Sequence, residues 1–297
     1  MKEIIIDCDP GVDDATAIAM ALKNPSIKVR GITTVAGNVG LEKTTKNALK
    51  TLEFFEKGDI PVYRGNNKPL RKEYVEPIFS IHGTDGLGDS GLLEPQLVAK
   101  DGAVDFIVSQ LEAQPGQITV IALGPLTNIA QVAERVDTRK FCEIYIMGGA
   151  FWVAGNVTEF AEFNAFTDPD AAKIVYESGI PIKVVGLDVT NRVAISRQDF
   201  EDLKKLSSRQ ARFFVKICKN FVDKSQKPRS AFFWDPIAMA WFIDESLIRT
   251  EKGSVTVVTD SLQRGQTKFI NGEGNVEVAS SIDSRRFFEI FFDFLQK

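Results

Sequence analysis

An α/β fold is predicted for this chain: an open, mostly parallel sheet flanked by helices, with a helical C-terminal third. Short apolar runs typical of buried strands alternate with amphipathic helical patterns through the first two thirds of the chain. Polar residues follow the ends of several of these runs, where parallel α/β sheets usually bind ligands. No linker, internal repeat or low-complexity segment divides the 297 residues, so we expect a single domain over residues 1–297.

Hydrophobic periodicity predicts the elements of this alternating part. Strands are expected at residues 4–6, 28–34, 61–63, 117–123, 141–147 and 182–185. Helices are expected from Asp13 to about Leu22, at 41–55 and 101–112, up to about Glu134, and at 168–178, where Asp168 and Pro169 supply a cap and a first-turn proline. Because a helix follows each strand at short range, the strands should run parallel with both faces covered.

Two stretches, residues 64–95 and 151–167, show no clear periodicity. Irregular segments of this length within a compact domain are usually functional loops. Disorder is the alternative for the first stretch, but Ile78, Phe79, Ile81 and Leu87 make it too apolar for that. We therefore expect an ordered binding loop there.

The C-terminal third is predicted to be richer in helices, at residues 196–206, 208–224, 237–242 and 284–294. Three short strands are expected between the last two helices, at residues 255–258, 266–270 and 276–278. They could form an antiparallel hairpin.

Composition excludes several classes of protein. The net charge of −4, with both signs interspersed, argues against partners such as nucleic acids or anionic membranes. No apolar run is long enough to cross a membrane and no signal peptide is evident, so we expect a cytoplasmic protein. Three widely spaced cysteines form neither a disulfide framework nor a CxxC pair. The single histidine, His82, excludes zinc sites that need two or three histidines.

Four aspartates surround the end of the first strand. Asp7 and Asp9 share a strand face, and Asp13 and Asp14 open the next helix, where its dipole favours negative charge. Carboxylates this close repel one another, so either some are protonated or a cation lies among them. A helix cap would explain only one or two of the four. We therefore favour a hard divalent cation with oxygen ligands, Ca²⁺ or Mg²⁺.

Asp235 is a fifth unusual acid, because it lies within an apolar, aromatic run just before Pro236. An acid in such surroundings must be paired, cap a helix or bind a metal. A cap would suit the proline that follows. Alternatively, Asp235 completes from a distance the cation site that begins at Asp9.

These residues belong to an ordered set of motifs: DCDPGVDD at residues 7–14, TTVAGN at 33–38, IHG at 81–83, GPLTN at 124–128, MGG at 147–149, AEFN at 161–164 with DP at 168–169, and WDP at 234–236. The set resembles that of the nucleoside hydrolase family, in its inosine–uridine-preferring type, and spans nearly the whole chain. The resemblance implies the nucleoside hydrolase fold, one open α/β domain with a Rossmann-like core. It also implies a Ca²⁺ ion at the bottom of a deep pocket.

The resemblance further implies a role for each matching residue. The carboxylates of Asp9, Asp14 and Asp235 and the backbone carbonyl of Leu123 would bind Ca²⁺. The matching substrate-binding positions, several of which would hold the ribose hydroxyls, are Asp13, Asn38, Asn156, Glu162, Phe163 and Asn164. The implied activity is Ca²⁺-dependent hydrolysis of the N-glycosidic bond of ribonucleosides to ribose and a free base. Asp9 would take the proton of a water activated by the ion, and the protein would be a homodimer or homotetramer.

The chain departs from the family pattern just before the last metal ligand. The inosine–uridine type carries there a histidine that protonates the leaving base, whereas this chain has Trp234. An indole cannot supply that proton, but it can stack on the base, as in purine-specific members, or simply pack in the core. His82, the other histidine of the type, is retained, and we assign it a catalytic role in the pocket. The choice between purine and pyrimidine bases stays open.

Two other functions remain in view. A DxD pair at a strand end also resembles aspartyl-phosphate phosphatases, with Asp7 as nucleophile and Mg²⁺ as cofactor, although the Asp13–Asp14 pair does not fit them. A non-catalytic protein that binds a nucleoside or ribose could have kept the pocket and lost the activation of the leaving group at Trp234. Asp7 has no role in the leading hypothesis.

Overall fold

The computed structural model describes residues 1–77, 80–224, 229–230 and 233–296. Ile78 and Phe79, which we used to argue for an ordered loop, lie outside these ranges. No helix in the described part of the chain is long and apolar enough to span a membrane.

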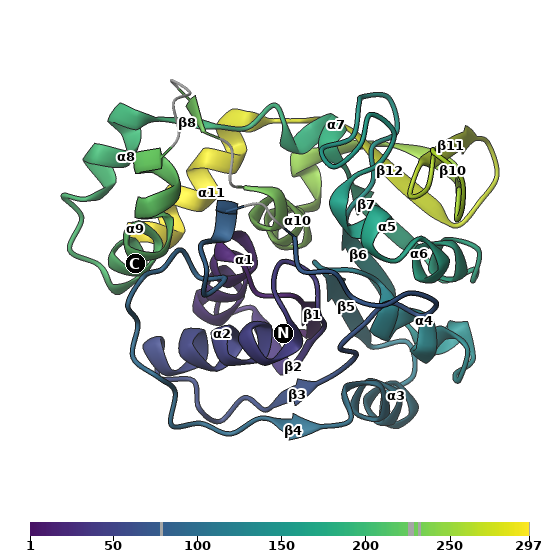
Figure 1. Ribbon diagram of the computed structural model, residues 1–297, viewed down its shortest axis with the longest axis horizontal. Helices are drawn as coiled ribbons and strands as arrows, with labels where there is room; N and C mark the ends of the chain where they lie inside the picture. The colour runs from purple at the N-terminus through teal and green to yellow at the C-terminus, as the bar shows by residue number, and fades with distance from the viewer. Residues whose placement is uncertain (78–79, 225–228, 231–232, 297) are drawn as a thin grey trace.

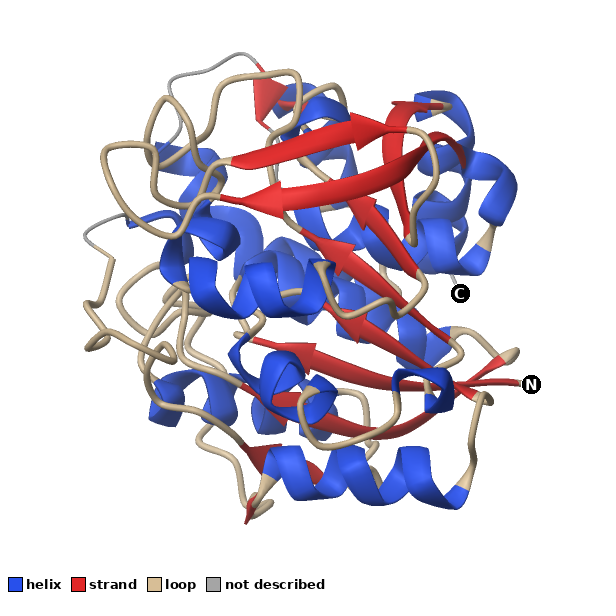
Figure 2. Cartoon of the chain, turned by 90° about the vertical axis from the view of Figure 1, so that its right-hand side faces the viewer, coloured by secondary structure: helices blue, strands red, loops and turns tan. Residues whose placement is uncertain are grey.

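A ten-stranded sheet with the order β11-β10-β12-β7-β6-β5-β1-β2-β3-β4 forms the centre of the molecule (Figures 1 and 2). Neighbouring strands are parallel except that β10 runs antiparallel to both β11 and β12. The strands are β1 (Lys2–Cys8), β2 (Ile27–Thr34), β3 (Val62–Arg64), β4 (Lys100–Asp101), β5 (Ile118–Ala122), β6 (Glu143–Met147), β7 (Ile182–Val185), β10 (Ile248–Val257), β11 (Thr267–Asn271) and β12 (Val276–Ile282). A separate two-stranded sheet pairs β8 (Ile195–Ser196) with β9 (Arg229–Ser230).

Helices cover both faces of the large sheet, as Figure 2 shows. One face packs against α1 (Val12–Lys23), α2 (Leu41–Phe54), α7 (Leu187–Thr190), α8 (Arg197–Leu203), α9 (Arg209–Lys224), α10 (Trp234–Ile243) and α11 (Ser284–Gln296). The other packs against α3 (Ala103–Ala113), α4 (Thr127–Ala133) and α6 (Pro169–Tyr176). The remaining helical segments are α5 (Phe163–Thr167) and the 3₁₀ turns η1 (Ser80–His82), η2 (Thr138–Lys140) and η3 (Glu245–Leu247).

Strand β1 shows why these residues form a central strand. Ile4 and Ile6 join the core on one face of the sheet, and Ile5 joins the core on the other, because side chains alternate along a strand. All three are fully buried. A strand that is apolar on both sides must lie inside a covered parallel sheet.

The direction in which the sheet grows changes at β1. From β1 the chain adds β2, β3 and β4 on one side, then returns to add β5, β6 and β7 on the other. Adjacent loops therefore leave β1 and β5 in opposite directions, which opens a crevice above their carboxyl ends. The aspartates that follow β1 lie at this point.

The α/β fold and the mostly parallel sheet are confirmed, while several local predictions are wrong. The second irregular stretch contains a short helix, α5, and the helix expected at 237–242 begins earlier, at Trp234. The antiparallel pairing expected of the C-terminal strands is confirmed, since β10 pairs antiparallel with β11 and β12, and β12 also pairs with β7 and joins all three to the large sheet. The strands β4, β8 and β9 and the helix α7 were not predicted, since elements of two to four residues carry too little periodicity.

Candidate active site

The turn between β1 and α1 is held by one of its own acids. The backbone N–H of Gly11 donates to Asp14 Oδ2 at 2.8 Å, and the N–H of Asp9 donates to Asp14 Oδ1 at 3.2 Å. Asp14 is the third residue of α1, so its carboxylate reaches back over the helix start as in a capping box. This contact fixes Asp9 and Asp14 beside each other.

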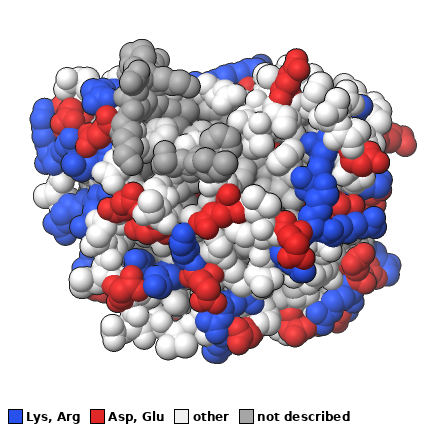
Figure 3. Space-filling model, viewed as in Figure 1, with Lys and Arg blue, Asp and Glu red and all other residues white. Residues whose placement is uncertain are grey.

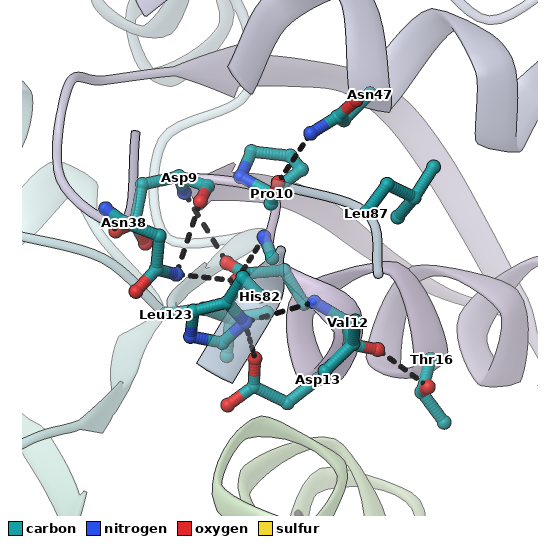
Figure 4. Close-up of polar contacts among 12 residues, drawn as sticks. Asp9, Pro10, Val12, Asp13, Thr16, Asn38, Asn47, His82, Leu87 and Leu123 are labelled. Carbon is teal, nitrogen blue, oxygen red and sulfur yellow. Dashed lines mark hydrogen bonds and ion pairs between the residues drawn. The ribbon is translucent and has the colours of Figure 1, made fainter. Parts of the chain in front are cut away.

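Asp9 is held from the end of β2. The backbone N–H of Asn38 donates to Asp9 Oδ2 at 2.7 Å, and the Asn38 side-chain amide donates to the Asp9 carbonyl at 3.1 Å (Figure 4). Two glycines make room for the carboxylate: a Cβ on Gly37 would lie 2.1 Å from Asp9 Oδ2, and one on Gly124 would lie 2.5 Å from Oδ1. The TTVAGN and GPLTN motifs therefore shape the space around Asp9.

A second group of acids comes together from the two ends of the chain. Carboxylate oxygens of Asp13, Asp14 and Asp235 all lie within 4.8 Å of one another. Asp235 reaches the group from α10, which packs against α1. It is the second residue of α10, and Phe233 occupies the N-cap position, so the alternative reading of Asp235 as a helix cap is wrong.

Burial among like charges changes the acidity of these groups. Asp9, Asp13, Asp14 and Asp235 are each at most 6% exposed. Burial raises the pKa of Asp13 to about 7 and that of Asp14 to about 6, with added repulsion from Asp13 in the second case. Burial and the other aspartates raise the pKa of Asp9 and Asp235 well above the usual range. Without a cation, Asp9 and Asp235 would therefore hold protons at neutral pH, and Asp13 would do so in part.

The donor set fits a hard cation. It consists only of oxygens, it carries several negative charges, and Asp13 Oδ1 is buried without a hydrogen-bond donor. Oxygen ligands with several carboxylates are what Ca²⁺ binds in proteins. A cation would also remove the repulsion that raises these pKa values.

His82 is fixed in one orientation against the start of α1. The backbone N–H of Val12 donates to His82 Nδ1 at 3.2 Å (Figure 4), and the ring packs where a Cβ on Gly11 would lie, 2.5 Å from Nδ1. Burial lowers the pKa of His82 to about 4, although the charge of Asp14 opposes this. The contact of 3.8 Å with Asp13 is therefore not an ion pair, and the neutral ring carries its proton on Nε2.

The AEFN motif holds the loop that follows β6. Glu162 is the N-cap of α5, and its Oε2 accepts from the N–H groups of Gly149, Asn164 and Ala165. Asn164 in turn donates its amide to the carbonyls of Leu123, at 2.7 Å, and Met147, at 3.1 Å. The motif thus ties α5 to the ends of β5 and β6.

A cavity of about 170 Å³ collects nearly all residues that the sequence singled out. Of those assigned to metal or substrate, only Asp14 is absent from its wall. Its wall includes Trp234, Phe163 and Asn156, whose side chain accepts from the Phe163 N–H. Within the described part of the chain, the indole Nε1 of Trp234 is buried without a hydrogen-bond partner, so the ring, not its N–H group, borders the cavity. The wall also includes Pro77, Ile81, Met147 and Val157, which the sequence did not mark as substrate-binding.

The structure explains Asp7, for which the sequence offered no role. Its Oδ1 accepts from the Thr33 hydroxyl at 2.5 Å and from the Asn128 amide at 2.8 Å, while Oδ2 has no partner. Asn128 also donates to the carbonyl of Thr34 and accepts from the N–H of Asn66. Asp7 therefore points away from the other acids, into a buried network that joins β1, β2 and α4. In the sequence, the last residue of the GPLTN motif, Asn128, was the only indication of this partner of Asp7.

The charged surface gives no sign of a polyanion site on the face that Figure 3 shows, where acidic and basic side chains are interspersed. Many of them form pairs, such as Lys43 with Glu76 and Arg64 with Asp101. The acidic groups of the cavity, by contrast, have no lysine or arginine among the described residues of its wall. A concentration of unpaired negative charge therefore lies at the crevice above β1.

Comparisons with known proteins agree with this geometry. A family model described as inosine-uridine preferring nucleoside hydrolase matches residues 4–289. The chain is 36% identical over 278 residues to the probable uridine nucleosidase 2 of Oryza sativa subsp. japonica, covering 91% of this chain and 82% of the relative. It is 35% identical over 306 residues to the pyrimidine-specific ribonucleoside hydrolase RihA of Salmonella gallinarum, covering 99% of this chain and 98% of the relative.

Solved structures are similar over the same length. A plant nucleoside hydrolase, the PpNRh1 enzyme, superposes with a TM-score of 0.92 at 36% identity and 99% coverage of both chains. An inosine-guanosine nucleoside hydrolase superposes with a TM-score of 0.91 at 28% identity, again with 99% coverage of both chains.

Proposed function

This chain belongs to the inosine-uridine preferring nucleoside hydrolase family, whose members act on the N-glycosyl bonds of ribonucleosides, and we propose that it does so with Ca²⁺ and with uridine among its substrates. The observation that carries the proposal is the gathering of Asp9, Asp13 and Asp235 in one cavity with the base-side residues His82 and Trp234. The relatives at 34–37% identity named as uridine nucleosidases support uridine.

The cation would be held by Asp9, Asp14 and Asp235 with the carbonyl of Leu123. When bound, Ca²⁺ supplies positive charge that lowers the pKa of a neighbouring water and neutralises the buried acids. Asn164 already donates to the Leu123 carbonyl, whose second lone pair remains for the cation.

Asp9 is proposed as the general base. Its Oδ2 accepts the Asn38 N–H, which orients the carboxylate, and the absence of a Cβ on Gly124 leaves the room that Oδ1 occupies. In this position Asp9 would take the proton of the attacking water as the glycosidic bond breaks. The sugar becomes oxocarbenium-like in that step, and the carboxylate of Asp13 would stabilise the positive charge on it.

The departing base would be stabilised by neutral groups. His82 carries its proton on Nε2 because Nδ1 accepts the Val12 N–H, so it would donate a hydrogen bond to the base and not transfer a proton from an imidazolium. The ring of Trp234 would stack on the base and exclude water. This arrangement suits a base that leaves readily as an anion.

The decisive experiment compares the wild-type protein with Asp9→Asn in the presence of Ca²⁺. Uridine should be cleaved to ribose and uracil, and the variant should lose at least about 10³-fold in kcat, because it lacks the base. Circular dichroism and gel filtration check that the variant is folded and report the oligomeric state, for which we predict a homodimer or homotetramer. Absence of ribose release from uridine, cytidine, inosine, adenosine and guanosine alike would overturn the proposal in favour of a binding protein.

A further inference from the structure

A second cavity lies beside the candidate active site. It measures about 430 Å³ and shares Pro77, Val157 and Phe163 with the wall of the first cavity. The rest of its wall comes from the loop at residues 69–76 and from the C-terminal end of α5 with Arg264. We name it the annexe. Its size is that of an ordinary small-molecule pocket.

Much of the annexe wall is apolar, and three of its four charged residues contact other groups, Lys72 being the fourth. Glu73 pairs with Lys68 and Glu76 pairs with Lys43, each at 2.8 Å. The guanidinium of Arg264 lies over the ring of Phe166, 4.9 Å from its centroid, and donates to the carbonyl of Thr167. The surfaces that remain for a ligand include the apolar and aromatic side chains of Pro69, Tyr74, Val75, Val157, Phe163 and Phe166.

The position of the annexe relative to the acids indicates which part of a substrate would reach it. This step rests on the proposed function. With the ribose 2′ and 3′ oxygens at the acids and the base at His82 and Trp234, the remaining substituent of the ring is the 5′ carbon. This carbon would then face the wall residues Asn156, Val157 and Phe163. Two of these three residues are the ones that also border the annexe.

We propose that the annexe is a subsite for an apolar group attached to the 5′ carbon of the nucleoside, so that the enzyme accepts 5′-alkylthio-5′-deoxynucleosides. An alkyl chain that passes Val157 and Phe163 would enter the annexe and be removed from water there. A 5′-phosphate, by contrast, would lose part of its hydration against the apolar side chains of Val157 and Phe163, which would disfavour it.

The test uses uridine and a series of 5′-deoxy-5′-alkylthiouridines with methyl, ethyl and propyl chains, together with uridine 5′-monophosphate. With the wild-type protein and Ca²⁺, kcat/KM should rise about three- to fourfold for each added methylene, which is the usual gain for burying that group. Uridine 5′-monophosphate should be cleaved at least tenfold less efficiently than uridine. A decline in kcat/KM with each methylene would overturn the proposal.

Two variants test whether the alkyl group lies in the annexe. Thr167→Phe fills the annexe, and Val75→Asp puts a charge on a wall residue that is 81% exposed, so folding is not at risk. Both variants should abolish the increase in kcat/KM with alkyl chain length and leave kcat/KM for uridine unchanged. Val98→Asp, at a position 84% exposed and outside the annexe, is the matched control and should keep the gain. An undiminished gain in both annexe variants would overturn the proposal.

Binding measurements distinguish a failure of this inference from a failure of the proposed function. Calorimetric titration of the alkylthio series into the Ca²⁺-loaded Asp9→Asn variant, which should not cleave them, should give the same three- to fourfold steps in Kd, and these should be lost when Val75→Asp is added. If uridine is not hydrolysed but these steps are found, the subsite stands and the catalytic proposal fails. If uridine is hydrolysed and neither Kd nor kcat/KM improves with chain length, the subsite fails alone.

Discussion

Asp7 is the clearest case in which one buried side chain should govern the pH dependence of stability. Burial raises its pKa to about 7 from an ordinary value of 3.8, against the opposing hydrogen bonds from Asn128 and Thr33. A group whose pKa is higher in the folded state stabilises the fold fully below its unfolded pKa. That contribution is lost as the pH rises towards 7.

Asp7→Asn should remove this dependence, because an amide keeps the hydrogen-bonding shape and does not titrate. We expect the free energy of unfolding of the wild type, relative to the variant, to fall by about 2 kcal/mol between pH 5.5 and 8. Urea denaturation of both metal-free proteins measures it. Asp137→Asn is the control, because its pKa of about 2 lies below this window. Parallel curves for wild type and Asp7→Asn would contradict the assignment.

Trp234 is the residue on which base preference should depend. Its ring borders the cavity next to Asp235, while its Nε1 is buried and has no hydrogen-bond partner among the residues that the structure describes. Trp234→His would replace a stacking surface with a titratable group. The ratios of kcat/KM between bases should therefore shift by tenfold or more, while the free energy of unfolding changes little. The measurement is kcat/KM for uridine, cytidine, inosine, adenosine and guanosine in both proteins. A loss of stability with an unchanged order of substrates would show that Trp234 only packs.

At the scale of elements, one carboxylate oxygen organises the loop between β6 and α6. Glu162 Oε2 accepts three backbone N–H groups, and two of them are in the first turn of α5. A helix of five residues has little stability of its own, so its position depends on this cap. Asn164 lies on that helix and contacts the carbonyls of Leu123 and Met147.

Glu162→Ala should therefore destabilise the protein by about 1–3 kcal/mol, because three buried donors lose their acceptor. KM for uridine should rise as Asn164 and Asn156 shift, whereas Glu162→Gln should recover part of both losses. The exposed Glu159 on the same loop provides the control, Glu159→Ala. Urea denaturation and steady-state kinetics check these outcomes, and equal effects of the two alanine variants would refute them.

At the scale of the molecule, Ca²⁺ should link α1 at one end of the chain to α10 near the other. In its absence Asp9, Asp13, Asp14 and Asp235 have raised pKa values, so stability should decline as the pH rises through 6 and 7 and these acids lose protons. Binding requires the deprotonated acids, so the affinity for Ca²⁺ should increase over the same range.

Removal of Ca²⁺ with a chelator should thus lower Tm more at pH 8 than at pH 5.5. The lost stabilisation follows the ratio of free Ca²⁺ to its Kd, about 2.7 kcal/mol at a hundredfold excess. Calorimetric scans with and without the chelator measure it, and Asp235→Asn should show a much smaller difference. A chelator effect of the same size at both pH values would contradict the proposed role of these acids.

The sequence by itself determined the α/β class, most strand and helix positions, and the acidic and amide residues of the cavity wall. These follow from local patterns: an apolar run such as Ile4–Ile6 can only be buried, and the motifs keep their order along the chain. Periodicity could not reveal β4, α5 or the pairing of β12 with β7, because short elements and long-range pairing depend on contacts made elsewhere.

Only the tertiary structure decided which partners each aspartate has. It directed Asp7 to Asn128, brought Asp235 from α10 to Asp13 and Asp14, and fixed the proton of His82 on Nε2 through the Val12 N–H. It also formed the annexe beside the active site. Such relations join residues up to about two hundred positions apart, and their physical basis is burial and hydrogen-bond geometry, which a linear sequence does not contain.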